Sequence, residues 1–144
     1  MDWERSSSAR SSGRWCQSIT LSCASNNAHA VRKALALHRK WAAESPANYA
    51  APYALIQGTW ARVCGRHREA EKYLDQAMAL ADENHLPMLG AVAHEEAAAL
   101  YTETGRVTLR EHMLRSAYQR FVNGGMTLRA DRLAREHPWL LSRH

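Results

Sequence analysis

The sequence predicts an all-α fold in which antiparallel helix pairs stack side by side as an α-solenoid of about six helices. One helical pattern occurs twice at a spacing of forty residues, so that Gly65 aligns with Gly105 and Leu74 aligns with Leu114. A repeat of this length is typical of stacked helix pairs, because one pair alone cannot bury its apolar face. Hydrophobic residues make up 46% of the chain, but Ala supplies many of them and Phe occurs once. This composition favours helices over strands.

A length of 144 residues suits one domain. Residues 1–27 are predicted to be a disordered Ser/Arg-rich leader, because they contain too little apolar surface to offset the entropy of ordering. A transit-like peptide, a phosphorylation target and an unrelated leader all fit this composition, and the unrelated leader is favoured. The composition changes abruptly after residue 27, so residues 28–141 are predicted to form the helical domain, or to begin within a domain of a larger protein.

The first helix is predicted over residues 28–43, capped by Asn26 or Asn27 and ending before Pro46. Its apolar stripe is expected to be Ala34, Leu37, His38, Trp41 and Ala42.

The second helix is predicted from Pro52 to Cys64, since Pro52 inside a helix costs about 3 kcal/mol. The alternative is a start at Pro46 with Ser45 as its cap. Gly58 lies inside this helix, which is best explained by close approach of the next helix.

The third and fourth helices are predicted over residues 68–84 and 87–104. The stripe of the third contains Ala70, Tyr73, Leu74, Ala77, Leu80 and Ala81, and that of the fourth contains Leu89, Ala93, Ala97, Leu100 and Tyr101. Gly65 and Gly105 are expected to end the second and fourth helices in the left-handed conformation.

The fifth helix is predicted to begin at Thr108, with Glu111 completing a capping box, and to end at the sequence Asn123-Gly124-Gly125. A sixth helix is predicted over residues 127–136. The apolar tail from Trp139 to Leu141 is expected to fold back over the last helix pair or to serve as a docking peptide.

These residues resemble the tetratricopeptide repeat, which places small residues in its first helix, a glycine in its turn and small–large–small residues in its second helix. The first copy carries Gly58, Gly65, Ala70, Leu74 and Ala77. The second copy keeps Tyr101, Gly105, Leu114 and Ala117, but it has Arg110 and Ala98 at two of the small positions. The resemblance implies a degenerate repeat with a longer loop than the usual unit of about 34 residues.

Residues 33–141 are also similar to the helical-repeat region of large multidomain signalling proteins. Those proteins join a serine/threonine kinase-like domain, a predicted NTPase, this helical region, a GAF sensor and often a histidine kinase. The similarity rests on His38-Arg39-Lys40, Ser45-Pro46-Ala47-Asn48-Tyr49, Gly65-Arg66, Ala70, Ala77, Glu96-Ala97-Ala98, Gly105-Arg106 and His137-Pro138-Trp139-Leu140. It implies a linker and interaction module, and no catalytic residue is carried over because the catalytic domains are absent from the chain.

No fragment of the sequence supports catalysis or a bound metal or cofactor. The run that begins at His94 resembles a zinc-peptidase helix, but the second histidine of that motif is replaced by Ala98. Cys64 and His67 lack an orienting partner and oxyanion donors, so a buried structural cysteine is favoured. The chain is therefore predicted to be non-enzymatic, with no cofactor.

Charge is distributed unevenly along the chain. Residues 1–43 and 105–144 each carry a net charge of +5, whereas residues 44–104 carry −5. The simplest interpretation of this distribution is that the charges lie on solvated helix faces and in a basic leader. Nucleic-acid binding is disfavoured because no aromatic–basic recognition motif accompanies the charge. Three cysteines without framework spacing and the lack of a long apolar run predict a cytoplasmic protein without a membrane span.

The favoured function is a protein-interaction and signal-coupling module, whose partner is another protein or a neighbouring domain. Candidate contact residues on the less apolar faces are Gln57, Trp60, Ala61, His94 and Glu95. Trp60 has the most weight as an anchor, and its alternative is packing on the preceding helix around Trp41. Two further readings stay open: a free-standing regulatory adaptor whose basic ends contact nucleic acid, and an unrecognised small enzyme. The oligomeric state is undecided.

Overall fold

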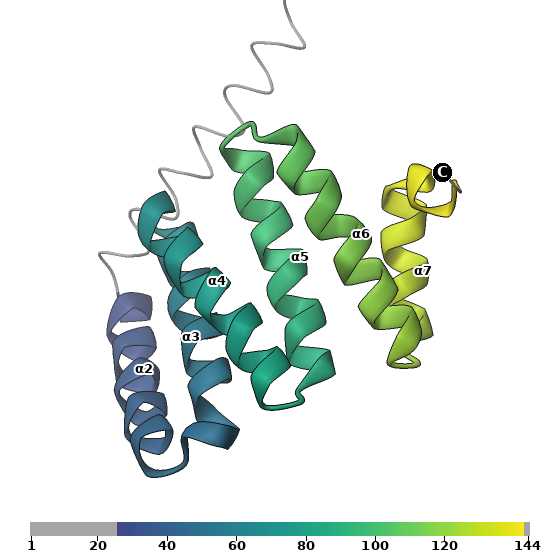
Figure 1. Ribbon diagram of the computed structural model, residues 1–144. Coiled ribbons are helices and arrows are strands. Elements are labelled where there is room, and N and C mark those ends of the chain that lie inside the picture. The colour runs from purple at the N-terminus through teal and green to yellow at the C-terminus, as the bar shows by residue number, and fades with distance from the viewer. Residues whose placement is uncertain (1–25, 143–144) are drawn as a thin grey trace, which may run out of the picture.

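The computed structural model describes residues 26–142, which form six α-helices, one short 3₁₀ helix and no strand. The elements are α2 (Asn26–Glu44), α3 (Pro46–Val63), α4 (His67–Glu83), α5 (Pro87–Glu103), α6 (Val107–Asn123), α7 (Thr127–Glu136) and η1 (Pro138–Leu141). Figure 1 shows the helices in one row, alternating in direction, from α2 at the left to α7 at the right. The all-helical class is confirmed.

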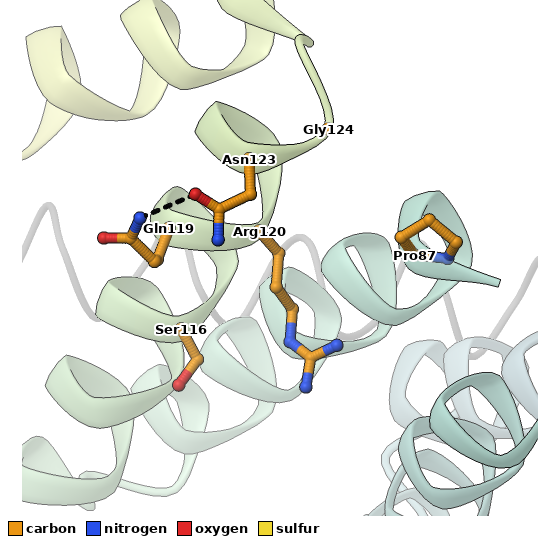
Figure 2. A pocket seen from close by; sticks show the side chains of 6 residues that line it. All are labelled: Pro87, Ser116, Gln119, Arg120, Asn123 and Gly124. Carbon is orange, nitrogen blue, oxygen red and sulfur yellow. Dashed lines mark hydrogen bonds between the residues drawn. The ribbon is translucent and has the colours of Figure 1, made fainter. Parts of the chain in front are cut away.

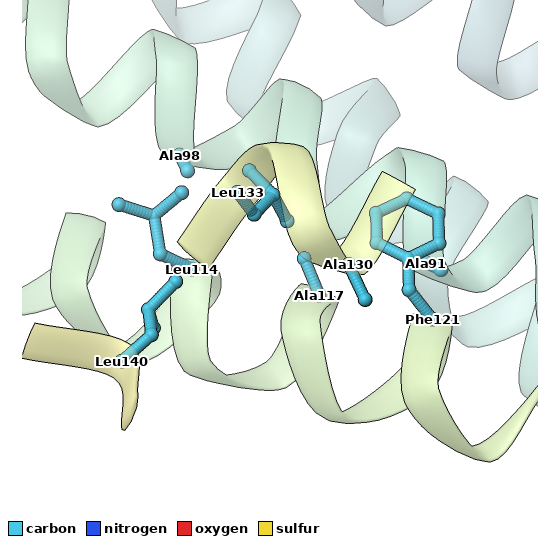
Figure 3. Packing of buried hydrophobic residues seen from close by; sticks show 8 residues of the cluster. All are labelled: Ala91, Ala98, Leu114, Ala117, Phe121, Ala130, Leu133 and Leu140. Atoms are coloured by element: carbon cyan, nitrogen blue, oxygen red, sulfur yellow. The ribbon is translucent and has the colours of Figure 1, made fainter. Parts of the chain in front are cut away.

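Each helix packs on the next one along the chain, and α3 also contacts α5. The buried side chains are mainly alanines with a few large residues between them, of which Phe121, Leu74, Leu100 and Leu133 are the largest that are fully buried. Alanine at a contact lets two helix axes approach closely. Figure 3 shows the cluster at the α7 end, where side chains from α5, α6, α7 and η1 meet: Ala91, Ala98, Leu114, Ala117, Phe121, Ala130, Leu133 and Leu140.

Four connections of three residues each join the helices from α3 to α7, and they share one geometry. In each, the middle residue has a positive φ: 77° at Gly65, 56° at His85, 72° at Gly105 and 72° at Gly125. The amide after it donates to a carbonyl five residues back, as Arg66 does to Ala61 at 2.8 Å and Leu86 does to Ala81 at 2.8 Å. This is the Schellman arrangement, which satisfies a carbonyl at the end of the helix. Helix ends therefore recur every twenty residues.

The longer loop inferred for the degenerate repeat is not present. Helices α3 to α6 contain 17 or 18 residues each, and the connections between them contain three. The residues beyond a 34-residue unit lie in the helices.

The predicted start of the second helix is wrong. Helix α3 begins at Pro46, with Ser45 as its cap residue, and continues through Pro52. Pro46 suits the first helical position because its fixed φ is already helical. Pro52 removes one backbone hydrogen bond, but its neighbours Ala51 and Ala54 are 0% and 2% exposed, so the packing of this segment holds it helical.

The predicted caps are also wrong at two helices. Asn26 and Asn27 are part of α2, and Thr108 lies inside α6, which begins at Val107. The cap residue of α6 is Arg106, which makes no side-chain capping bond, so no capping box forms. The three-residue connection leaves no room for one, because α6 begins two residues after Gly105.

Two other sequence-based expectations about packing are confirmed. A Cβ atom built on Gly58 would lie 2.8 Å from Cγ of Leu74 and 3.1 Å from the Leu74 backbone nitrogen, so α3 and α4 are in close approach there. The apolar tail folds back as η1, which buries Leu140, and Arg115 lies 5.0 Å above the Trp139 ring.

The apolar stripe predicted for the first helix is only partly buried. Ala34 is exposed, Leu37 is 46% exposed and Trp41 is 36% exposed.

Candidate protein-interaction groove

An apolar groove with a volume of about 350 Å³ lies between the first half of α3 and the start of α5. It lies beside the α4–α5 connection, which contributes Leu86 to its lining. Its lining residues are Asn48, Pro52, Leu55, Leu86, Pro87, Met88, Leu89 and Val92. Asn48 is the one polar side chain among them.

The groove follows from the local sequence. Helices α3 and α5 are parallel and both begin with a proline, at Pro46 and Pro87. Helix α4 connects them from one side, so their opposite faces remain open to solvent at this end. Met88 at the rim is 61% exposed, which is unusual for a large apolar side chain in a structured helix.

Ion pairs close the other end of the α3–α5 face. Arg62 donates from Nε and Nη2 to Glu96 Oε2 at 3.2 and 3.1 Å, and from Nη1 to Glu103 Oε1 at 2.6 Å. The Arg62 side chain is 18% exposed and that of Glu96 is 27% exposed. The shared face of α3 and α5 is therefore apolar at one end and ion-paired at the other.

Similar ion pairs link α4 with α6 and with the α6 cap residue Arg106, and link α5 with α7. Arg106 Nη1 lies 2.9 Å from Glu71 Oε1, and Arg120 Nη1 lies 2.7 Å from Asp82 Oδ1. Glu95 of α5 pairs with Arg132 of α7. Acidic residues of the middle segment thus bind arginines of the basic C-terminal segment. This pairing explains much of the uneven charge distribution and lowers the positive charge available to nucleic acid.

A second pocket, of about 540 Å³, lies between α5 and α6 and is lined by Pro87, Ser116, Gln119, Arg120, Asn123 and Gly124. In Figure 2, Arg120 extends away from Gln119 and Asn123, which are joined by a hydrogen bond of 2.9 Å. The Arg120 guanidinium makes two hydrogen bonds to Asp82, at 2.7 and 3.1 Å, and these bonds lower the pKa of that carboxyl. Its charge is therefore already neutralised, so this pocket is a weaker candidate for an anionic ligand.

Two of the predicted contact residues are buried. Ala61 is 1% exposed and packs among Ala70, Leu74, Ala97, Leu100 and Tyr101. His94 is 9% exposed, and its Nδ1 lies 2.7 Å from the Gly90 carbonyl oxygen. Burial lowers the pKa of His94. Neither side chain is accessible to a partner in this structure.

The other three predicted contact residues, Gln57, Trp60 and Glu95, are partly exposed but do not line the groove. The Glu95 carboxylate forms an ion pair with Arg132, and its Oε2 lies 3.9 Å from Nη1 of Arg129. The predicted set is thus divided between α3 and α5, and none of its members lines the groove.

Trp60 does not pack around Trp41. The ring partners of Trp41 are His38 and Tyr49, with 5.1 and 5.5 Å between ring centroids. Tyr49 and Trp60 are eleven residues apart on α3, or about 16 Å along the axis, so Trp60 lies near the opposite end of the α2–α3 pair.

None of the groove residues is among the contact residues predicted from the sequence. The sequence predicts that Leu89 lies on the buried stripe of its helix and that Pro52 begins a helix. Met88 is the one groove residue that stands out in the sequence, because it is a large apolar residue directly after the proline that begins α5. The groove becomes visible only when α3 and α5 are placed side by side.

The remaining sequence fragments form no further site in the described part of the chain. Cys64 is partly buried at the end of α3 and is disulfide-bonded, and it is the one cysteine within residues 26–142. Within the same residues, no three His, Cys, Asp or Glu side chains are grouped so as to hold a metal ion.

None of the helices described has the length and apolar character needed to span a membrane. No family model, curated protein or solved structure matches the chain.

Proposed function

We propose that the chain is a non-catalytic helical-repeat module of the tetratricopeptide-like kind, which binds a protein segment in the groove between α3 and α5. The observation that carries the proposal is the groove itself: it is open, has a volume of about 350 Å³ and is lined by one polar side chain and seven apolar residues. Large exposed apolar surfaces are uncommon on soluble proteins, and concave ones often mark binding sites.

Two further features support a solenoid of helix pairs. The left-handed connections recur at positions 65, 85, 105 and 125, so a pair of helices with its connections occupies forty residues. Ion pairs then link each described helix from α3 to α5 with the helix two further along. In a stack of helix pairs, alternate helices line one surface, and partners dock on that surface as helices or extended peptides.

The groove test uses Met88→Glu. Met88 is 61% exposed, so the substitution leaves the core intact while placing a charge at the rim of an apolar site. Peptides selected from a displayed library against the wild-type chain are expected to bind Met88→Glu about tenfold more weakly in fluorescence anisotropy, a loss of about 1.4 kcal/mol. Leu128→Glu is the matched control, because Leu128 is 84% exposed and lies outside the groove.

Equal affinity of the two variants for every selected peptide would refute the groove as the binding site. Selection that yields no binder would count against an interaction module altogether.

We further propose that this module belongs to a larger signalling protein, on the strength of the resemblance of residues 33–141 to the helical region of multidomain kinases. An immunoblot of source cells with an antibody against residues 66–125 measures the size of the native polypeptide. A band well above the 16.2 kDa of this chain supports the proposal. A band at that mass favours a free-standing adaptor.

A further inference from the structure

Helix α2 forms one end of the described stack. It packs chiefly on α3, whereas α3, α4, α5 and α6 each pack on at least two other elements. In Figure 1 its outer side faces away from every other helix. This outer side exposes Leu37 by 46% and Trp41 by 36%, and Tyr49 at the adjoining start of α3 is 39% exposed.

The opposite end of the stack is different. There η1 covers part of the last helices and buries Leu140, and the exposed side of α7 is mostly polar and mixed in charge, with Arg129, Asp131, Arg132, Arg135 and Glu136. The large apolar exceptions at this end are Leu128 and Leu141, which are 84% and 63% exposed. Terminal units of stacked-helix proteins need such a polar outer face to stay soluble. The α2 end therefore lacks the cover that the α7 end has.

The outer side of α2 is also basic. Four exposed residues, Arg32, Lys33, Arg39 and Lys40, take part in no ion pair within the described residues. This contrasts with the arginines of the C-terminal segment, of which four bind carboxylates. Unpaired positive charge beside exposed apolar side chains is complementary to a partner that carries both acidic and apolar groups.

The spacing of these residues defines a pattern along the helix. Lys33, Leu37 and Lys40 follow one another at intervals of four and three, so they share one face, and Trp41 lies beside them. The two lysines are two turns apart, or about 10.5 Å. We call the surface formed by Lys33, Leu37, Lys40, Trp41 and Tyr49 the α2 end face.

We propose that the α2 end face binds an acidic amphipathic α-helix of a protein partner, with two carboxylates two turns apart and an apolar residue between them. A helix fits because the surface is the flank of a helix at the end of a stack, and because a helix satisfies its own backbone hydrogen bonds over an apolar contact. Residues 1–25 of this chain do not match this acidic partner, because they contain three arginines and two carboxylates. The α2 end face and the α3–α5 groove are different surfaces, so binding at one does not depend on binding at the other.

A protein helix is favoured over nucleic acid because of the aromatic side chains. The Trp41 ring already contacts Tyr49 at 5.5 Å and His38 at 5.1 Å between centroids. Binding of single-stranded nucleic acid depends on aromatic faces that are free to stack on bases.

The test uses a fluorescein-labelled helical peptide of Ala and Gln that carries two Glu seven residues apart and one Leu between them. A second peptide has Lys in place of both Glu. Fluorescence anisotropy is expected to show binding of the Glu peptide to the wild-type chain, and Lys33→Glu/Lys40→Glu is expected to weaken it by about tenfold and to bind the Lys peptide instead. Both lysines are exposed, so the double variant is expected to keep the helical circular dichroism of the wild type.

The matched control is Arg68→Glu/Lys72→Glu on α4, which makes the same change in net charge at two exposed positions away from α2. It is expected to bind the Glu peptide as the wild type does, and so is Met88→Glu in the groove. The proposal is overturned if the wild type does not bind the Glu peptide, or if the α4 control loses as much affinity as the α2 variant. Tighter binding to oligothymidine or to phosphatidylserine vesicles, lost in the α2 variant, would overturn it in favour of nucleic acid or membrane.

Discussion

Of the four residues with positive φ in the equivalent connections, His85 is the one that is not glycine. Gly65, Gly105 and Gly125 adopt positive φ without steric cost, whereas His85 adopts φ 56° with a Cβ atom. A residue with a Cβ in this conformation costs about 1 kcal/mol relative to glycine. The His85 side chain is exposed, and no hydrogen bond or ion pair among the described residues involves its ring. The geometry of the connection, rather than a contact of the ring, therefore holds this residue in place.

We expect His85→Gly to stabilise the chain by about 1 kcal/mol, because glycine adopts the left-handed conformation freely. Equilibrium unfolding in urea, followed by circular dichroism, measures the change at constant m-value. His85→Ala is the control, since it removes the ring but keeps the Cβ atom, and it is expected to change stability by less than about 0.5 kcal/mol. Stabilisation by the alanine variant as large as that by glycine would show that the ring, and not the backbone, is the source of the strain.

At the scale of helices, the sequence is informative about helix centres and less so about their ends. The stripe of α4 was predictable because Ala70, Leu74 and Ala77 recur with the period of a helix, and all three are 0% exposed. The start of α3 is predicted wrongly because the sequence shows the cost of placing Pro52 inside a helix. The packing that offsets this cost is not visible in the sequence. Thr108 matched a capping pattern, but the hydrogen bonds of the preceding connection start the helix one residue earlier.

Helix α5 is expected to make the stability of the domain depend on pH through His94. Its pKa is lowered, first by burial, so the folded state resists protonation more than the unfolded state does. The stability that the neutral ring contributes is fully present above the unfolded value near 6.5 and is lost as the pH falls through the folded pKa. We therefore expect the free energy of unfolding to fall between pH 7.5 and 5.5, by an amount that is smaller in His94→Gln.

His38→Gln controls for the hydrogen bond itself. Nδ1 of His38 lies 2.8 Å from the carbonyl oxygen of Ala34, the same bond four residues back that His94 makes, but on the solvent-facing helix α2. This variant is expected to keep the wild-type pH dependence, measured by urea unfolding at each pH. If His94→Gln also kept the full dependence, burial of this ring would not be its cause.

At the scale of the whole molecule, the candidate groove and the ion pairs could not be predicted from the sequence. The groove joins Pro52 to Met88, and the ion pairs join residues 34 to 41 positions apart, such as Arg62 to Glu96 and to Glu103. Periodicity within a helix says which face is apolar, but not which distant helix faces it. The uneven charge along the sequence was visible, yet its pairing across alternate helices follows only from the stacking.

The interhelical ion pairs are expected to hold neighbouring pairs of helices in a fixed relation, and Arg62 tests this most directly. Surface ion pairs contribute about 0–1 kcal/mol each, but removing one partner of a largely buried pair leaves a charge without compensation. Arg62 is 18% exposed and binds two carboxylates. Arg62→Met would leave Glu96 and Glu103 without it, so we expect a loss of about 1–2 kcal/mol in urea unfolding, a value between these two limits.

Arg66→Met provides the matched control, because the Arg66–Glu69 pair lies within one turn of chain and its side chains are 51% and 52% exposed. It is expected to cost less than about 0.5 kcal/mol. Amide hydrogen exchange adds a readout of location: Arg62→Met should lower protection in both α3 and α5, because the residue joins them, while protection in α6 and α7 changes less. Equal losses for the two variants would show that α3 and α5 are held together by apolar packing alone, and that these ion pairs do not set how the helix pairs stack.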